Sequence, residues 1–125
     1  DIAAIAHEVG ALVHVAGVHY AAHQPVDIGA LGADLFVCSP YKYLGPHCGV
    51  MAAMPGILEA IQPDKLLPST NAVPERFELG TLPYETMAGA TAAVEFLART
   101  AHLGHETRAT MNRVLRNGAY TIQCG

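Results

Sequence analysis

Lys42 stands in the setting of this sequence that most favours covalent chemistry. It occurs in the segment SPYKYLGPH, just after a short apolar run, between two tyrosines and before a Gly-Pro turn. A lysine amine is a nucleophile only in its neutral form, which partial burial at the end of a strand favours. Spacing alone still favours the alternative that Lys42 extends from a loop into water, as most lysines do.

Histidines at helical spacing raise the question of a metal site. His19 and His23 are four residues apart, a separation that can hold zinc on one helix face. Gly17 and Pro25 indicate a turn in this stretch, however, and the sequence has no H-E-x-x-H pattern. We therefore expect no metal to be bound.

The cysteines favour a reducing environment. Cys38, Cys48 and Cys124 are an odd number and show no C-x-x-C spacing, so neither a disulfide framework nor a zinc ribbon is indicated. Cys38 belongs to an apolar run and is expected in the core. Reduced thiols are typical of a cytoplasmic protein.

The composition predicts a chain that buries much of itself. Of 125 residues, 51% are hydrophobic and only 14% are charged, which excludes a disordered chain. A net charge of -4 leaves no basic surface for nucleic acid. No apolar run reaches the roughly 18 residues of a membrane-spanning helix, and the first residues do not resemble a secretory signal. We expect a cytoplasmic protein without nucleic-acid or membrane partners.

The pattern of apolar residues before Lys42 predicts an α/β fold with a mainly parallel sheet flanked by helices. Helical spacing predicts a helix over residues 1–10. The β-branched runs 11–15 and 34–39 predict buried strands, and a short helix beginning at Asp27 is expected between them. Such an alternation of helices and strands favours parallel pairing.

The residues after Lys42 predict a hairpin and two helices. A strand over residues 48–53 follows a Gly-Pro turn, so it is expected to pair with the strand 34–39 around Lys42. Residues 104–118 predict a helix that ends at an Asn-Gly pair. The segment 85–101 predicts an amphipathic helix with four apolar residues on one side, Met87, Ala90, Val94 and Leu97.

Three blocks of this sequence resemble the class V aminotransferase and cysteine desulfurase family. They are VHVAGVHY, PVDIGALGADLFVCSPYKYLGPHCGV and ERFELGT, and both their order and their spacing agree with the family. The resemblance implies an enzyme of fold type I that depends on pyridoxal 5'-phosphate (PLP). It implies that residues 1–100 are the central part of the PLP-binding large domain, and that residues 101–125 form a helix leading toward a small C-terminal domain.

The same resemblance implies roles for individual residues. Lys42 would form the Schiff base with PLP and later move the proton on the α-carbon of an amino-acid substrate. Ser39 and Tyr41 fall where the family contacts the cofactor phosphate, and His19 falls where a side chain binds the phenolic oxygen. Gly80 and Thr81 match a loop that reaches the phosphate of the neighbouring subunit, which implies a homodimer.

Two departures from the family pattern concern the cofactor. Ala16 stands where the family has an aspartate that pairs with the protonated pyridine nitrogen, and a methyl group cannot do this. The family's phosphate loop, its stacking aromatic residue and its substrate-binding arginine are expected outside these 125 residues. Two functions therefore remain open: a PLP-dependent enzyme that removes sulfur from an amino acid or transfers its amino group, and a non-catalytic binding or assembly module.

Overall fold

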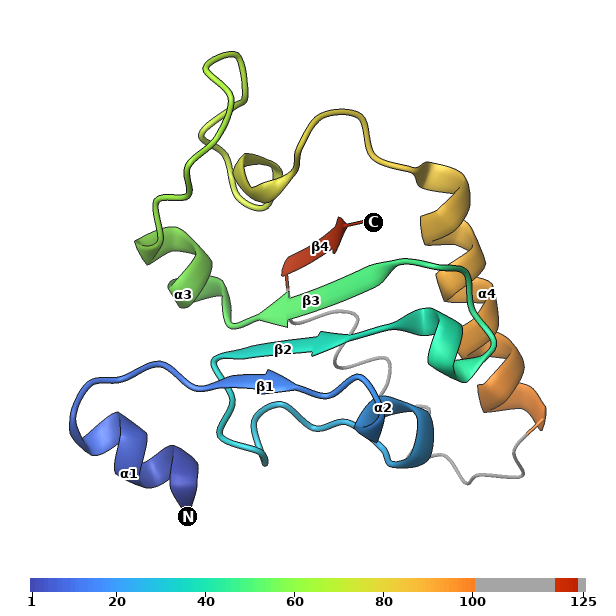
Figure 1. Ribbon diagram of the computed structural model, residues 1–125, viewed down its shortest axis with the longest axis horizontal. Helices are drawn as coiled ribbons and strands as arrows, with labels where there is room; N and C mark the ends of the chain where they lie inside the picture. Colours follow the sequence, from blue (N-terminus) through green and yellow to red (C-terminus); the bar gives the residue numbers. More distant parts are fainter. Residues whose placement is uncertain (101–118, 124–125) are drawn as a thin grey trace.

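The computed structural model describes residues 1–100 and 119–123 as one layer of strands with helices around it (Figure 1). The elements follow one another as α1 (Ile2–Glu8), β1 (His14–Ala16), α2 (Tyr20–His23), β2 (Leu35–Cys38), the 3-10 helix η1 (Pro40–Tyr43), β3 (Gly49–Ala53), α3 (Pro55–Ala60), the 3-10 helix η2 (Glu75–Phe77), α4 (Tyr84–Thr100) and β4 (Ala119–Gln123).

The described strands form one mixed sheet in the order β1-β2-β3-β4. β1 and β2 are parallel, with Val15 opposite Phe36, and β2 and β3 are antiparallel, with Val37 opposite Met51. β4 then pairs antiparallel with β3. The predicted α/β class is confirmed. The expected parallel pairing is found between β1 and β2. The predicted hairpin around Lys42 is also confirmed.

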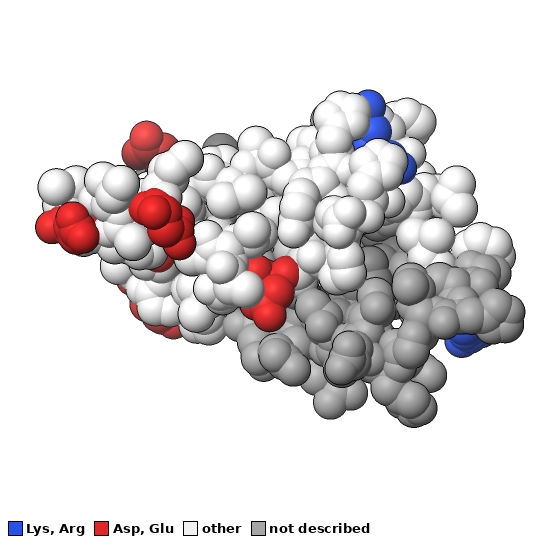
Figure 2. All heavy atoms as spheres, turned by 90° about the horizontal axis from the view of Figure 1, so that it is seen from below, with Lys and Arg blue, Asp and Glu red and all other residues white. Residues whose placement is uncertain are grey.

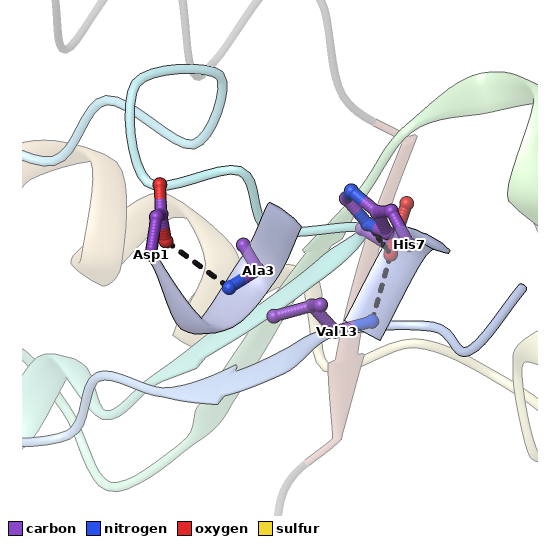
Figure 3. Close-up of polar contacts among 5 residues, drawn as sticks. Asp1, Ala3, His7 and Val13 are labelled. Carbon is purple, nitrogen blue, oxygen red and sulfur yellow. Dashed lines mark hydrogen bonds and ion pairs between the residues drawn. The ribbon is translucent and has the colours of Figure 1, made fainter. Parts of the chain in front are cut away.

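The N-terminal helix is fixed to the sheet by polar contacts (Figure 3). Asp1 caps α1, because its Oδ1 accepts a hydrogen bond from the Ala3 N–H at 3.1 Å. Asp34 Oδ2 lies 2.9 Å from His7 Nε2 and accepts a 2.7 Å hydrogen bond from the Val13 N–H. One carboxylate therefore joins α1, the start of β1 and the start of β2.

The core is small and consists mainly of alanine. Phe36 of β2 is 2% exposed, and Leu58 of α3 is 1% exposed. A Cβ at Gly17 would lie 2.0 Å from the Phe36 ring, so any residue other than glycine at this position would require the ring or the backbone to shift. Eight further buried hydrophobic residues of the described chain belong to this core, namely Ala3, Val26, Ala33, Cys48, Ala52, Ala53, Ala90 and Ala93.

Helix α4 supports the end of the β2-β3 hairpin. It contacts η1, and a Cβ at Gly89 would lie 3.3 Å from Pro46 Cγ in the hairpin turn. Ala90 and Ala93 are buried, Met87, Val94 and Leu97 are half-buried, and the charged residues Glu85 and Glu95 are exposed. The predicted amphipathic helix is confirmed, with bounds at Tyr84 and Thr100.

The short helix predicted to begin at Asp27 is wrong. Asp27 does act as a cap, since its Oδ1 accepts from the Ala30 N–H at 3.0 Å, but only one turn forms. Gly32 follows with a φ of +63°, which ends the turn. The short helix lies instead at α2, where a turn was predicted. It ends at His23, and the next residue, Gln24, is extended because it precedes Pro25.

The helix predicted over residues 1–10 is confirmed as α1, whereas the first strand differs from expectation. β1 occupies His14–Ala16 rather than residues 11–15, and two of its three residues are exposed, so this strand is not buried. The apolar residues of this segment face outward. Ile2 is 84% exposed, Val9 just after α1 is 81% exposed, and only Ala3 of the helix is buried.

Some expectations fall partly or wholly outside the described residues. The helix predicted over 104–118 lies outside them. β4 covers residues 119–123 and was not predicted, so this part of the segment 101–125 is a strand rather than the expected helix.

Charged side chains are sparse on the surface. Figure 2 shows acidic side chains from the α1 end to the middle of one face, whereas the visible lysine and arginine side chains lie at the opposite end. Within the described part of the chain, no helix is long and apolar enough to cross a bilayer. Among those same residues, no group of three histidine, cysteine or acidic side chains could hold a metal ion.

Candidate functional site

The candidate site is the tip of the β2-β3 hairpin, which η1 forms. Ser39 precedes η1, and its carbonyl oxygen accepts a 2.9 Å hydrogen bond from the Lys42 N–H. The Gly45 N–H donates to the Pro40 carbonyl at 2.8 Å, and a Cβ at Gly45 would lie 2.7 Å from Pro40 Cβ. Leu44 takes a left-handed backbone with a φ of +69°. The sequence SPYKYLG thus makes a tight turn that presents Lys42.

Lys42 is exposed in the described chain, contrary to the partial burial predicted for it. Its Nζ lies 5.0 Å from the centroid of the Tyr41 ring, a distance at which an ammonium group is attracted to the ring face. The reason for the exposure is that η1 projects beyond the ends of β2 and β3. Tyr41 is itself 42% exposed.

The Tyr41 ring also stacks on His47. The two ring centroids are 5.0 Å apart and the ring planes differ by 9°. The closure of the hairpin turn brings these two side chains together from positions six apart in the sequence. Sequence reasoning assigned no role to His47 at this tip, since no periodicity links it to Tyr41.

Tyr43 and Cys38 form a second pair at the base of the tip. The Tyr43 hydroxyl oxygen lies 3.5 Å from Cys38 Sγ, in a hydrogen bond between the end of β2 and the end of η1. Burial raises the pKa of the Cys38 thiol, and the hydrogen bond from Tyr43 opposes this to a smaller extent. Burial is also the main cause that raises the pKa of Tyr43 well above its usual range. Both groups are therefore neutral at physiological pH.

His19 lies next to the tip, at the start of α2. α2 contacts η1, which brings the predicted His19 and Lys42 to neighbouring elements. His19 is exposed and its side chain does not cap α2. Its imidazole is thus free to meet a ligand.

Gly80 and Thr81 lie on a different loop, between η2 and α4. Gly80 has a φ of +101° with open space around it, and both residues are exposed. Buried Arg76 fixes the start of this loop, because its Nη2 donates hydrogen bonds to the carbonyl oxygens of Leu58 and, at 2.8 Å, Glu59 at the end of α3. Sequence reasoning did not single out Arg76.

Ala16 ends β1 as an exposed residue. The following Gly17 N–H donates to the Val37 carbonyl at 2.8 Å, so the backbone continues along β2. The methyl group of Ala16 offers neither charge nor a hydrogen bond to a bound group. Ala16 therefore could not act as the charged partner that the resemblance implies for this position.

The donor set suits the phosphate and the aldehyde of PLP but not its pyridine nitrogen. Two hydroxyl groups and one amine, from Ser39, Tyr41 and Lys42, belong to one short segment, and hydroxyl groups and cations are good partners for phosphate oxygens. An imidazole is available at His19. Ala16 supplies no partner for a protonated ring nitrogen.

These features define a mixed α/β sheet with a lysine-bearing hairpin tip between two helices. A family model described as aminotransferase class-V matches residues 1–119. The chain belongs to this family.

Similar proteins include cysteine desulfurases. The chain is 35% identical over 109 residues to a cysteine desulfurase of Klebsiella pneumoniae, in a match that covers 77% of this chain and 27% of that protein. An aminotransferase-like protein of Gibberella zeae is 47% identical over 51 residues, which is 40% of this chain and 13% of that protein.

A solved structure shares the fold. The crystal structure of the cysteine desulfurase CsdA from Escherichia coli, in an S-sulfonic acid form, matches with a TM-score of 0.66 and 30% identity. The match covers 76% of this chain and 27% of CsdA. The chain thus spans about a quarter of the length of these desulfurases.

Proposed function

We propose that this chain carries the cofactor-binding lysine of a PLP-dependent enzyme that acts on an amino acid, by sulfur removal or by amino transfer. The observation that carries the proposal is the hairpin tip, where one tight turn combines the Lys42 amine with the hydroxyl groups of Ser39 and Tyr41. Membership of the aminotransferase class-V family supports it.

In this proposal each side chain has a distinct task. Lys42 would hold the cofactor through its amine and would carry a proton to or from the substrate α-carbon. Ser39 and Tyr41 donate hydrogen bonds to the phosphate, and His19 donates to the phenolic oxygen. PLP, when bound, supplies the electron sink that the protein side chains lack.

The proposal requires cover for Lys42, because its side chain is exposed in the described chain and the proposed chemistry needs a site closed to water. A homodimer would provide this cover and would bring Gly80 and Thr81 of one subunit to the phosphate site of the other. The open backbone of Gly80 permits a close approach of a phosphate oxygen. We propose that this dimer is cytoplasmic, since the Cys38 thiol forms no disulfide and such thiols stay reduced in that compartment.

One observation favours a second candidate, a non-catalytic binding or assembly module. Ala16 leaves the pyridine nitrogen without its charged partner. Loss of a buried charge pair costs about 3–5 kcal/mol, and such a loss in the transition state slows a reaction by about two to four decades. If Ala16→Asp restores turnover of cysteine or of an amino donor, the chain is an enzyme that lacks one carboxylate. If turnover stays absent, the non-catalytic binding or assembly module is favoured.

The sequence offers a matched control for the Schiff base, since it holds two lysines, Lys42 and Lys65. Lys65 is half-buried and donates a 2.7 Å hydrogen bond to the Ser69 carbonyl. The protein is incubated with PLP, its visible absorbance is recorded, and the adduct is reduced with borohydride and located by peptide mass spectrometry. We expect a weak band and an adduct on Lys42, lost in Lys42→Ala and kept in Lys65→Arg. Equal labelling of both lysines, or no adduct, would contradict the proposal.

A further inference from the structure

The Tyr41 ring contacts two functional groups of the hairpin tip. Its face attracts the Lys42 ammonium, 5.0 Å from the ring centroid, and the ring stacks on the His47 imidazole at a centroid distance of 5.0 Å. The planes of the two rings differ by only 9°. The amine, the phenol and the imidazole thus form one continuous set of contacts across the turn.

We propose that His47 is a positioning residue that holds Tyr41, and through Tyr41 the Lys42 amine, in place for the cofactor. This inference rests on the proposed function, because it concerns how the tip receives PLP. It adds a residue that sequence reasoning had not assigned to the cofactor site.

The physical argument starts from the exposure of the tip. Tyr41 is 42% exposed and belongs to a turn of four residues, so little packing restricts its side chain. A free side chain loses rotamer entropy when it must take one orientation to meet a ligand. The stack on His47 already restricts the Tyr41 ring. Part of the rotamer entropy is therefore lost on folding, and less is lost when the cofactor binds.

The same contact restricts Lys42. A lysine side chain has four rotatable bonds, and on this exposed turn the attraction to the Tyr41 face restricts them. If the ring turns, this attraction turns with it. The orientation of His47 therefore decides where both the phosphate-binding hydroxyl and the amine are presented.

The flat geometry indicates that the stack, rather than the charge of His47, performs this task. A phenylalanine at position 47 can make the same stack but carries no charge, whereas alanine removes the ring. His47→Phe and His47→Ala therefore separate the two contributions. His23→Ala is the matched control, since His23 is also exposed and lies at the end of α2.

The experiment measures two quantities in each variant. Ring-proton NMR signals of Tyr41, assigned with Tyr41→Phe, report the stack without any cofactor. The PLP concentration that gives half-maximal borohydride-trapped adduct on Lys42 reports its effect on the amine. We expect His47→Ala to shift the Tyr41 signals and to raise this concentration about two- to tenfold, and His47→Phe and His23→Ala to match the unchanged protein.

The outcomes distinguish this inference from the proposed function. An adduct on Lys42 that forms equally well in His47→Ala overturns the positioning role and leaves the Schiff base intact. A His47→Phe variant as weak as His47→Ala overturns the stack as the cause. No adduct on Lys42 in the unchanged protein overturns the proposed function, and the positioning role with it.

Discussion

A thiol and a phenol meet where β2 passes into η1. Cys38 and Tyr43 share a 3.5 Å hydrogen bond, and burial is the main reason why the pKa of each is raised. A thiol whose pKa is raised is a poor nucleophile at neutral pH. Cys38 is therefore a structural residue at the base of the tip and a poor choice for the persulfide-forming cysteine of a desulfurase.

Alkylation of Cys38 should need a higher pH in the folded protein than in the unfolded chain. Burial raises the pKa of the thiol, so the reactive thiolate forms later in a titration. Tyr43→Phe should move the midpoint higher still, because the hydrogen bond from Tyr43 lowers this pKa. The midpoint is read from iodoacetamide labelling of the Cys38 peptide by mass spectrometry. A folded midpoint at or below the unfolded one would disprove this account.

The sequence predicted that Lys42 lies on a turn between two strands, because prolines, glycine and apolar runs are local signals. They did not foresee its exposure or its contact with Tyr41. The Tyr41-His47 stack and the Cys38-Tyr43 bond depend on how the closed hairpin aligns its two arms, which no local pattern encodes. Whether Ser39, Tyr41, His19, Gly80 and Thr81 meet a phosphate remains a prediction.

At the scale of elements, Arg76 fastens η2 to the end of α3. Its guanidinium group is buried and donates to the carbonyl oxygens of Leu58 and Glu59, which the last turn of a helix leaves without partners. Within the described residues, its Nε is buried without a partner. The anchor fixes the loop that leads to Gly80 and Thr81.

Arg76→Met should lower the free energy of unfolding by about 1.5–3 kcal/mol, since it removes hydrogen bonds from a charged donor to buried carbonyls. Arg99→Met is the control: Arg99 pairs with Glu95 at 3.2 Å on the exposed side of α4, so its loss should change stability by less than about 0.5 kcal/mol. Urea unfolding followed by circular dichroism measures both. Equal effects of the two changes would mean that Arg76 is no anchor.

A pair of glycines tests the packing of β1 against β2. Gly17→Ala places a methyl group 2.0 Å from the Phe36 ring and should cost about 1–3 kcal/mol of stability. Gly56→Ala in α3 meets nothing within 4 Å and should stay within about 0.5 kcal/mol of the unchanged protein. Thermal unfolding compares the two variants. A tolerated alanine at position 17 would show that the ring can move aside.

Local signals predicted the long elements better than the short ones. Helix α4 and the hairpin strands carry enough periodic apolar residues to be read directly. The turn at Asp27 and the helix at Tyr20 each involve about one turn, where a single cap or a nearby proline decides the outcome. β4 could not be foreseen because its pairing with β3 is a long-range contact.

For the molecule as a whole, Asp34 links three elements. It accepts from the Val13 N–H and lies beside His7, and these two contacts, in that order, lower the pKa of the carboxyl group below its ordinary value of 3.8. A group whose pKa is lower in the folded state stabilises the fold above its unfolded pKa. The contribution is lost as the pH falls through the lower, folded value.

Unfolding measured between neutral pH and strongly acidic pH should show this loss below pH 3.8. In Asp34→Asn the acid-dependent part should shrink, because asparagine can still accept from Val13 but cannot ionise. Asp64→Asn, at an exposed carboxylate of the loop after α3, should leave the profile unchanged. If Asp34→Asn and the unchanged protein lose stability identically as the pH falls, the ionised Asp34 carboxylate does not stabilise the fold.

The near contact of Gly89 with Pro46 has a consequence for packing. Because Gly89 has no side chain, the backbone of α4 can lie close to the turn that carries Lys42. An alanine at position 89 would bring a methyl group to 3.3 Å from Pro46 Cγ, so this glycine sets how closely α4 approaches the turn that carries Lys42.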